Sequence, residues 1–187
     1  MENKKDKKVS IKISIPEGVT GTLDETILTF KGSNGETTRD FLNPLVSIKL
    51  TNGEIELSTK SSKRKFARVL YTTVAHINNM IQGAKEGFTY ELKICSGHFP
   101  MTVKKEGNEV VISNFLGEKI PRRSKIIEGV DLEIKGDAIT VKSQSIENAG
   151  QTAANLEHAT FIKKRDRRVF QDGCYIISKP QQKWKNY

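Results

Sequence analysis

Residues 46–57, VSIKLTNGEIEL, decide the fold. Apolar and polar residues alternate on both sides of Asn52-Gly53, and a period of two is typical of a β-strand with one buried face. The Asn-Gly pair favours a tight hairpin turn, because both central residues of that turn need a positive φ. The segment is therefore predicted to form a β-hairpin. Residues 130–141, VDLEIKGDAITV, repeat the pattern 84 positions later, around Gly136-Asp137.

Each hairpin leads into a segment with helical periodicity. Between about residues 63 and 82, and again between about 146 and 158, apolar residues recur at spacings of three and four. We expect Ser61 or Ser62 to cap the first helix and Ser145 to cap the second, since a serine hydroxyl accepts a hydrogen bond from a free N–H group of the first turn. Gly83 and Gly87 are expected to mark the exit of the first helix.

The segments upstream of the hairpins also match. Residues 19–36 align with residues 101–118 at an offset of 82 and share a Thr, a Gly and a Glu. Because chance similarity does not explain a joint match of hairpin, helix and offset, the chain is predicted to be duplicated. The predicted fold class is α+β, with two tandem domains that each consist of a small, mostly antiparallel or mixed sheet covered on one face by one helix.

We therefore divide the chain at residue 87. Residues 1–87 are the first domain, with a short basic extension at Lys4, Lys5, Lys7 and Lys8; residues 88–178 are the second; and residues 179–187 form a basic aromatic tail. The chain has 187 residues, of which 36% are hydrophobic and 28% charged, and this composition favours small domains. No run is long and apolar enough for a membrane span or a signal peptide, which predicts a cytoplasmic protein. Cys95 and Cys174 are expected to be reduced.

The positive charge is concentrated near the end of the sequence. The formal net charge is +9, and residues 160–187 hold eight basic and two acidic residues, which is +6 of that total. Residues 163–168, KKRDRR, contain five cations between Phe161 and Phe170. Like charges repel, so such a run favours a partner with negative charge, usually phosphate. The alternatives are a solvated face and an acidic membrane surface.

The candidate RNA-binding residues follow from this charge. They are Lys163, Lys164, Arg165, Arg167, Arg168, Lys179, Lys183, Trp184 and Lys185. Trp184, with Tyr187, could stack on unpaired bases. Asp166 and Asp172 are expected to orient neighbouring guanidiniums or to close the Asp172-Gly173 turn.

Two further basic clusters have alternative interpretations. Arg122, Arg123 and Lys125 are additional candidates for RNA contact, or else part of a solvated loop. Lys60, Lys63, Arg64, Lys65 and Arg68 lie at the start of the first helix, where cations oppose the helix dipole. They could contact RNA or a neighbouring protein, or form a solvated face.

The sequence contains no catalytic motif. His76, His98 and His158 belong to no HExxH pattern, and CxxC, GxSxG and Walker motifs are missing as well. Cys95 and His98 are three residues apart in an extended segment, which does not fix a reactive geometry. Residues 32–35, GSNG, are predicted to form a turn and not a phosphate loop, since no Lys-Ser/Thr pair follows. We expect no enzyme activity, no cofactor, no metal and no small-molecule substrate.

Three sets of residues carry a resemblance to a known family. They are Gly35-Glu36 with Arg39, residues 151–156 (QTAANL), and residues 164–175 (KRDRRVFQDGCY). With the duplication, they make the chain similar to the sixth universal protein of the large ribosomal subunit, in its archaeal and eukaryotic branch (where the eukaryotic member is called the ninth). The chain lacks the Tyr-Lys-Gly-Lys-Gly tail of the bacterial branch, and it has Cys174 where a branched aliphatic residue is more usual.

The resemblance implies a structural protein of the cytoplasmic ribosome. Members of this family bind large-subunit ribosomal RNA chiefly through the second domain, near the stalk base and the factor-binding region. The implied partners are this RNA and neighbouring ribosomal proteins at the stalk base, with no membrane contact. The alternatives are a non-ribosomal RNA-binding module with a repeated fold, or a protein-interaction module whose basic tail meets an acidic protein.

Overall fold

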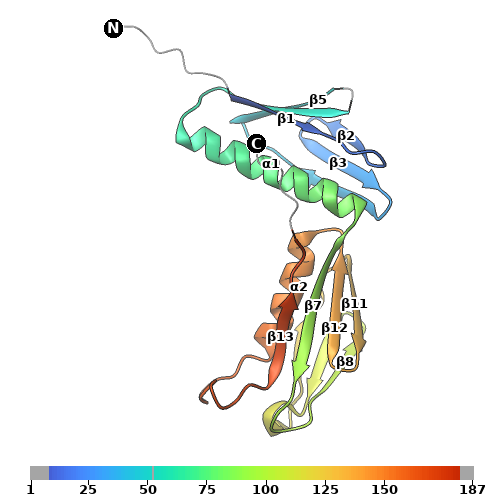
Figure 1. The fold of residues 1–187 in the computed structure, drawn as a ribbon, viewed down its shortest axis with the longest axis vertical. Helices are drawn as coiled ribbons and strands as arrows, with labels where there is room; N and C mark the ends of the chain where they lie inside the picture. Colours follow the sequence, from blue (N-terminus) through green and yellow to red (C-terminus); the bar gives the residue numbers. More distant parts are fainter. Residues whose placement is uncertain (1–8, 52, 182–187) are drawn as a thin grey trace. The chain divides into compact units, whose positions relative to one another are not determined.

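The computed structural model describes residues 9–51 and 53–181 (Figure 1). Their contacts divide the chain into two compact units, the first ending at Glu86 and the second beginning at Gly87. Each unit has its own hydrophobic core, and the two cores share no residue. The units are therefore described separately.

The first unit contains six strands followed by one helix. Its elements are β1 (Val9–Ser14), β2 (Thr20–Asp24), β3 (Ile27–Gly32), β4 (Gly35–Asp40), β5 (Val46–Thr51), β6 (Glu54–Thr59) and α1 (Arg64–Lys85). The strands form two antiparallel sheets, in the orders β1-β6-β5 and β2-β3-β4. The predicted hairpin is confirmed as β5–β6, in which Thr51 pairs with Glu54 and Gly53 has a φ of 84°. Asn52 lies outside the described residues.

The second unit repeats this order of elements and adds a strand. Its elements are β7 (Phe88–Cys95), β8 (Thr102–Glu106), β9 (Glu109–Ser113), the 3-10 turn η1 (Phe115–Gly117), β10 (Arg122–Lys125), β11 (Val130–Lys135), β12 (Ala138–Ser143), α2 (Ile146–Ala159) and β13 (Gly173–Ser178). The sheets have the orders β11-β12-β7-β13 and β10-β9-β8. The pairing of β7 with β12 corresponds to that of β1 with β6. The added strand β13 lies on the free edge of β7.

The predicted α+β fold of two tandem duplicated units is confirmed. The structure adds that the strands of each unit form two small sheets, and that every strand pair among the described residues is antiparallel. One helix covers both sheets of its unit, because α1 contacts β3 and β4 as well as β5 and β6, and α2 contacts β10 as well as β7 and β12. Each helix therefore joins its two sheets into one core.

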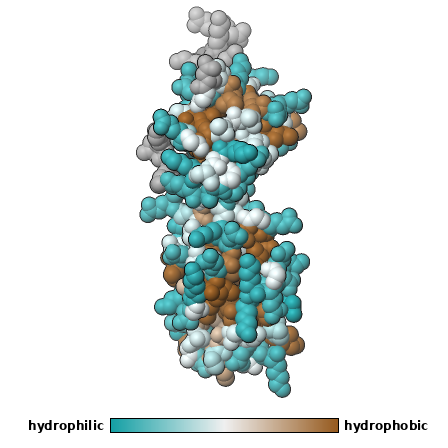
Figure 2. All heavy atoms as spheres, turned by 90° about the vertical axis from the view of Figure 1, so that its right-hand side faces the viewer, coloured by the Kyte–Doolittle hydropathy of each residue, from teal (hydrophilic) through white to brown (hydrophobic). Residues whose placement is uncertain are grey.

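The cores are built from the predicted alternation. In β6, Ile55 and Leu57 are buried and lie under Leu70, Val74 and Ile77 of α1 in one apolar cluster. In the second unit the core includes Leu92, Ile139, Val141, Ala153 and Leu156. Figure 2 shows the exterior of one face, where hydrophilic side chains surround smaller apolar areas. This distribution agrees with the low hydrophobic content of the chain.

The helix boundaries correct part of the sequence prediction. The N-cap of α1 is Lys63, without a side-chain cap, and the Ser61 hydroxyl instead accepts a hydrogen bond from the Lys63 N–H at 3.3 Å. Gly83 is a buried residue inside α1, whereas Gly87 follows the helix with a φ of 72°. For α2 the cap prediction is confirmed, since Ser145 accepts a hydrogen bond from the Asn148 N–H at 3.3 Å.

The turn of residues 32–35 closes the C-terminal end of α1. The Ser33 hydroxyl donates to the Lys85 carbonyl at 2.9 Å, and the Asn34 N–H donates to the Ala84 carbonyl at 3.0 Å. These bonds satisfy carbonyls that a helix end leaves without a partner inside the helix. A Cβ atom on Gly32 would lie only 2.4 Å from the Ala84 carbonyl oxygen. The turn therefore docks on the helix closely, as its glycine allows.

We predict that Gly32→Ala destabilises the first unit by about 3 kcal/mol, because the new methyl group meets backbone and the turn must leave the helix end. Urea denaturation followed by circular dichroism measures the change. Gly107→Ala is the matched control in the second unit: its φ is 61°, but no atom lies within 4 Å of its Cβ position. It should cost only the backbone strain, about 1 kcal/mol. Equal losses in the two variants would contradict the close docking of the turn.

Candidate nucleic-acid interface

The basic run lies in the connection between α2 and β13, at one end of the second unit (Figure 1). We call residues 161–172 the basic loop. Its beginning and end are anchored in the core, because Ile162 and Asp172 are only 5% and 2% exposed. The Thr160 hydroxyl accepts a hydrogen bond from the Cys174 N–H at 2.9 Å, which joins the end of α2 to β13. Residues 163–168 between these anchors are all exposed.

The three arginines of the basic loop have defined neighbours. Arg165 lies over the Phe170 ring and Arg167 over the Phe161 ring, with Cζ 4.8 Å from the ring centroid in both cases. The Arg168 guanidinium donates to the Asp166 carboxylate at 2.8 Å. This bond, followed by one from the Arg168 backbone N–H, lowers the pKa of Asp166. The expectation that Asp166 orients a guanidinium is confirmed.

The candidate lysines are less constrained. Lys163, Lys164 and Lys179 are exposed, and none of them has an ion-pair partner among the described residues. Lys164 adopts a left-handed backbone conformation with a φ of 59°, at the bend of the loop. Lys183, Trp184 and Lys185 lie outside the described residues, as does Tyr187. In the basic loop, each arginine side chain thus contacts a ring or a carboxylate (a held arginine), whereas the two lysines have no ion-pair partner among the described residues.

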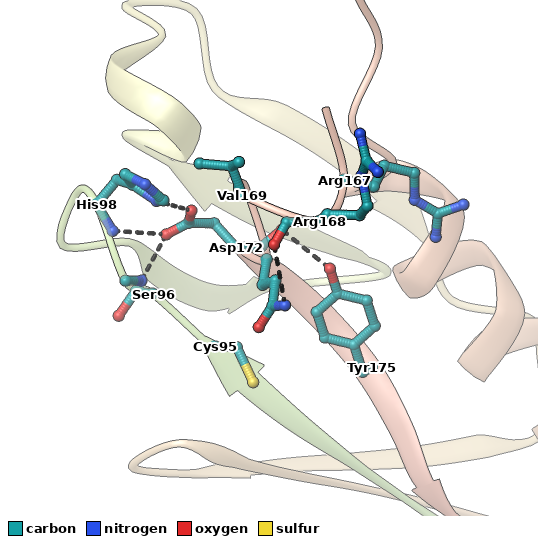
Figure 3. Close-up of a pocket in the computed structure, with 10 residues that line it drawn as sticks. Cys95, Ser96, His98, Arg167, Arg168, Val169, Asp172 and Tyr175 are labelled. Carbon is teal, nitrogen blue, oxygen red and sulfur yellow. Dashed lines mark hydrogen bonds and ion pairs between the residues drawn. The ribbon is translucent and has the colours of Figure 1, made fainter. Parts of the chain in front are cut away.

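Asp172 has a role that the sequence did not indicate. Its buried carboxylate accepts hydrogen bonds from the backbone N–H groups of Gly97 and His98 and from Nδ1 of His98, the last at 2.6 Å (Figure 3). Among the described residues it binds no guanidinium, and it ties the basic loop to the connection between β7 and β8. Burial alone would raise the pKa of Asp172, but the bonds from His98 and Gly97 outweigh burial and lower this pKa.

His98 extends this contact to an aromatic ring. Its imidazole stacks on Phe170 with 4.6 Å between ring centroids and 27° between planes. Both His98 and Cys95 line an open hollow of about 810 Å³ together with Arg167, Arg168 and Tyr175. Because Nδ1 of His98 is bound to Asp172, the histidine helps to hold the basic loop in place. In the sequence, the only hints of aromatic contacts in the basic loop are Phe161 and Phe170, which flank the run of cations.

The second basic cluster is divided between internal and exposed side chains. Arg122 on β10 binds both Glu118 oxygens, at 2.6 and 2.8 Å, and the carbonyls of Ala159 and Phe161, at 2.9 and 3.1 Å. Its guanidinium also lies 4.3 Å from the centre of the Phe115 ring. Arg122 thus holds the beginning of the basic loop against the neighbouring sheet. The hydrogen bond from Arg122 lowers the pKa of Glu118.

The other members of this cluster are exposed. Arg123 forms a surface ion pair with Glu109 at 3.1 Å, and Lys125 is exposed on the same strand. The cluster at the start of α1, residues 60–68, belongs to the first unit, and its basic side chains are exposed as well. The first turn of α1 contains no acidic residue. That these residues contact RNA or a neighbouring protein, or form a solvated face, stays a prediction.

The two cysteines lie on adjacent strands, one residue apart in register. Cys95 on β7 pairs in register with Gly173, next to Cys174 on β13, and both cysteines are free. Burial raises the pKa of Cys174 to about 12, so this thiol is unreactive. In the part of the chain that the structure describes, no three His, Cys, Asp or Glu residues gather as metal ligands. Neither α1 nor α2 is long and apolar enough to cross a membrane.

Comparisons with known proteins agree over nearly the whole chain. The family model described as "Ribosomal protein L6" matches residues 15–87 and 99–173, which correspond to the two units and include the basic loop. The large ribosomal subunit protein uL6 of Methanobrevibacter smithii is 48% identical over 89% of this chain and 94% of its own length. The uL6 proteins of Archaeoglobus fulgidus (46%, covering 90% and 88%) and Methanosarcina mazei (42%, covering 92% and 98%) are similar too.

We predict that Asp172→Asn lowers the free energy of unfolding by about 2 kcal/mol at pH 7, because an amide cannot replace a carboxylate that accepts three hydrogen bonds. The pKa of Asp172 is below its ordinary value in the folded state, so the stabilisation is present above about pH 4 and is lost as the pH falls further. The difference between the wild type and the variant should therefore shrink below pH 4 in urea denaturation.

Asp131→Asn is the control for this prediction. Asp131 is an exposed residue of β11 in the same unit, and its replacement should change the free energy of unfolding by no more than about 0.5 kcal/mol. Equal stability of the Asp172→Asn variant and the wild type at pH 7 would show that the carboxylate does not hold the loop.

Proposed function

Because the chain belongs to the ribosomal protein L6 family, we propose that it binds large-subunit ribosomal RNA near the stalk base and the factor-binding region, beside the ribosomal proteins of that site. Family membership makes it a structural protein of the large ribosomal subunit in the cytoplasm, and not an enzyme. The resemblance seen in the sequence is thereby confirmed.

The observation that carries the proposal is the conformation of the basic loop. Three arginines are exposed and yet held by Phe170, Phe161 and Asp166. Stacking on a ring leaves the N–H edges of a guanidinium free to donate, and two parallel donors match the oxygens of a phosphate. The loop therefore presents donors in fixed directions, which suits a folded RNA of one particular shape better than a flexible polyanion.

The mechanism has an electrostatic part and a positioning part. Exposed lysines and arginines neutralise phosphates and release counterions, which supplies affinity without shape selection. The held arginines fix the orientation of the protein on the RNA. The proposed binding residues are Lys163, Lys164, Arg165, Arg167, Arg168, Lys179, Lys183, Trp184 and Lys185, with Arg123 and Lys125 as additional exposed candidates. For Arg122, whose guanidinium has internal partners, we propose mainly a supporting role.

The proposal assigns RNA binding to the second domain, residues 88–178. Residues 1–87 form the other domain with the same scaffold, and residues 179–187 form the tail. Supporting this division, the basic loop and its anchors all belong to the second unit. The alternative, a protein-interaction module, is separated by nuclease treatment of a cell extract. An RNA partner is lost on digestion, whereas an acidic protein partner is retained.

We predict that replacing Lys164, Arg165, Arg167 and Arg168 together by Ala weakens binding to large-subunit ribosomal RNA. The slope of log affinity against log salt concentration should become shallower by about 3, at about 0.7 to 0.9 for each phosphate that is no longer neutralised. Filter binding at several salt concentrations gives the slope. Thermal stability should change little, because exposed charges contribute little to folding.

The control removes the same number of positive charges from the first unit. Lys12, Lys31, Lys49 and Lys85 are exposed there, and their replacement by Ala should change the slope by less than about 1. If the two variants had equally reduced affinity and slope, binding would be diffuse and the basic loop would not be the site.

A second prediction separates geometry from charge. Arg165→Lys together with Arg167→Lys keeps the charge but removes the planar forks, so the RNA affinity should fall about tenfold while the salt slope stays the same. Lys163→Arg with Lys164→Arg should change the affinity by less than about threefold, since these lysines are not held. Unchanged affinity in the Arg→Lys variant would leave charge alone as the basis of binding.

A further inference from the structure

A continuous series of side chains links the connection between β7 and β8 to the basic loop. It begins at the buried Asp172 carboxylate, which binds Nδ1 of His98 at 2.6 Å. The His98 ring stacks on Phe170, with 4.6 Å between centroids. The Phe170 ring in turn lies under the Arg165 guanidinium, at 4.8 Å. The series thus runs from a buried anion through two rings to an exposed cation.

We propose that Asp172, His98 and Phe170 are positioning residues, which hold the Arg165 guanidinium in the orientation in which it binds an RNA phosphate. The inference rests on the proposed function and extends it to three residues that do not bind the phosphate themselves. Phe170 supplies the surface on which the guanidinium lies, and His98 stacks on the same ring. Asp172 fixes His98 by its ring nitrogen and by its backbone.

The series is held at its Asp172 end, because this residue is buried. Asp172 directly precedes β13, and the N–H groups of both Gly97 and His98 point at its carboxylate (Figure 3). A free arginine side chain loses up to about 2 kcal/mol of rotamer entropy when it becomes ordered. If the side chain is already ordered in the unbound protein, less of this loss falls on binding, and the affinity rises.

Arg168 provides an internal comparison. Its guanidinium binds Asp166, two residues away in the same loop, at 2.8 Å, and among the described residues it forms no hydrogen bond or ion pair with Phe170 or His98. The proposed series therefore predicts that His98 and Phe170 determine the contribution of Arg165 but not that of Arg168. A general loosening of the loop would affect both arginines.

A double-mutant cycle on the full-length protein tests this difference. The probe is large-subunit ribosomal RNA transcribed in vitro, and the readout is the Kd at one fixed salt concentration. Arg165→Ala should raise the Kd about tenfold in the wild type but less than about threefold in the Phe170→Leu background, where an apolar side chain remains but the ring is gone. Arg168→Ala should raise the Kd by the same factor in both backgrounds.

Substitutions of His98 divide its two contacts. His98→Phe keeps a ring to stack on Phe170 and should preserve most of the effect of Arg165→Ala, whereas His98→Ala should abolish most of it. Thermal unfolding reports whether each variant is folded. If Phe170→Leu does not fold, the comparison of His98→Phe with His98→Ala decides.

Each outcome has one meaning. An equal effect of Arg165→Ala in the wild type, Phe170→Leu and His98→Ala backgrounds would overturn the positioning role and leave the proposed function intact. If neither Arg165→Ala nor Arg168→Ala changed the Kd of the wild type, the basic loop would not bind this RNA. The proposed function would then fail, and the positioning role with it.

Discussion

Burial of one helix against two small sheets is the constraint on which each unit depends. A sheet of three strands has one apolar face to cover, and in proteins a helix gains most of its stability from packing its amphipathic face. In the first unit α1 contacts strands of both sheets, so Leu70, Val74 and Ile77 close two apolar faces at once. The helix must be long and amphipathic for this purpose, and its 22 residues meet that need. The second unit satisfies the same constraint with 14 residues in α2.

After its helix, the second unit has a loop and a strand that the first unit lacks in the part of the chain that the structure describes. The chain continues from α2 into the basic loop and returns to the sheet as β13, on the edge of β7. Repulsion within the loop is balanced by anchors at both ends, since Arg122 binds the Phe161 carbonyl and Asp172 binds the segment at Gly97. Charged residues that repel one another are thus held by neighbours from two other segments. The proposed binding surface thus lies at the edge of the core of the second unit.

The sequence predicted the scaffold well, because the scaffold depends on local patterns. Alternation around Gly53 and Gly136, helical spacing and the cap at Ser145 each reflect a short segment of backbone, and these predictions were confirmed. The N-cap of α1 was predicted wrongly as Ser61 or Ser62. The helix begins at Arg64, so the cap position falls on Lys63, after both serines. The number of sheets was not predictable, since pairing between distant strands leaves no local mark.

The proposed binding surface was predictable from the sequence only in its charge. The run of cations identified the loop, but Asp172 and His98 are separated by 74 residues, and nothing near His98 points to a carboxylate. Similarly, in the sequence Arg122 looks no different from its basic neighbours Arg123 and Lys125. Its internal role is seen only in the structure, where Glu118 and backbone carbonyls surround its guanidinium. Residues that act by charge are visible in a sequence, whereas residues that hold them are visible only in the fold.

The pairing of β13 with β7 has a consequence for the order of assembly. These are the last and the first strands of the second unit, and the pairing of Cys95 with Gly173 spans almost its whole length. Contacts so distant in the sequence form late in folding, because a long loop must close first. During synthesis, β13 leaves the translating ribosome after all the other strands. A nascent chain therefore contains the cations of the basic loop before β13 can pair with β7 and hold the loop. The folded loop forms only after the whole unit has been translated.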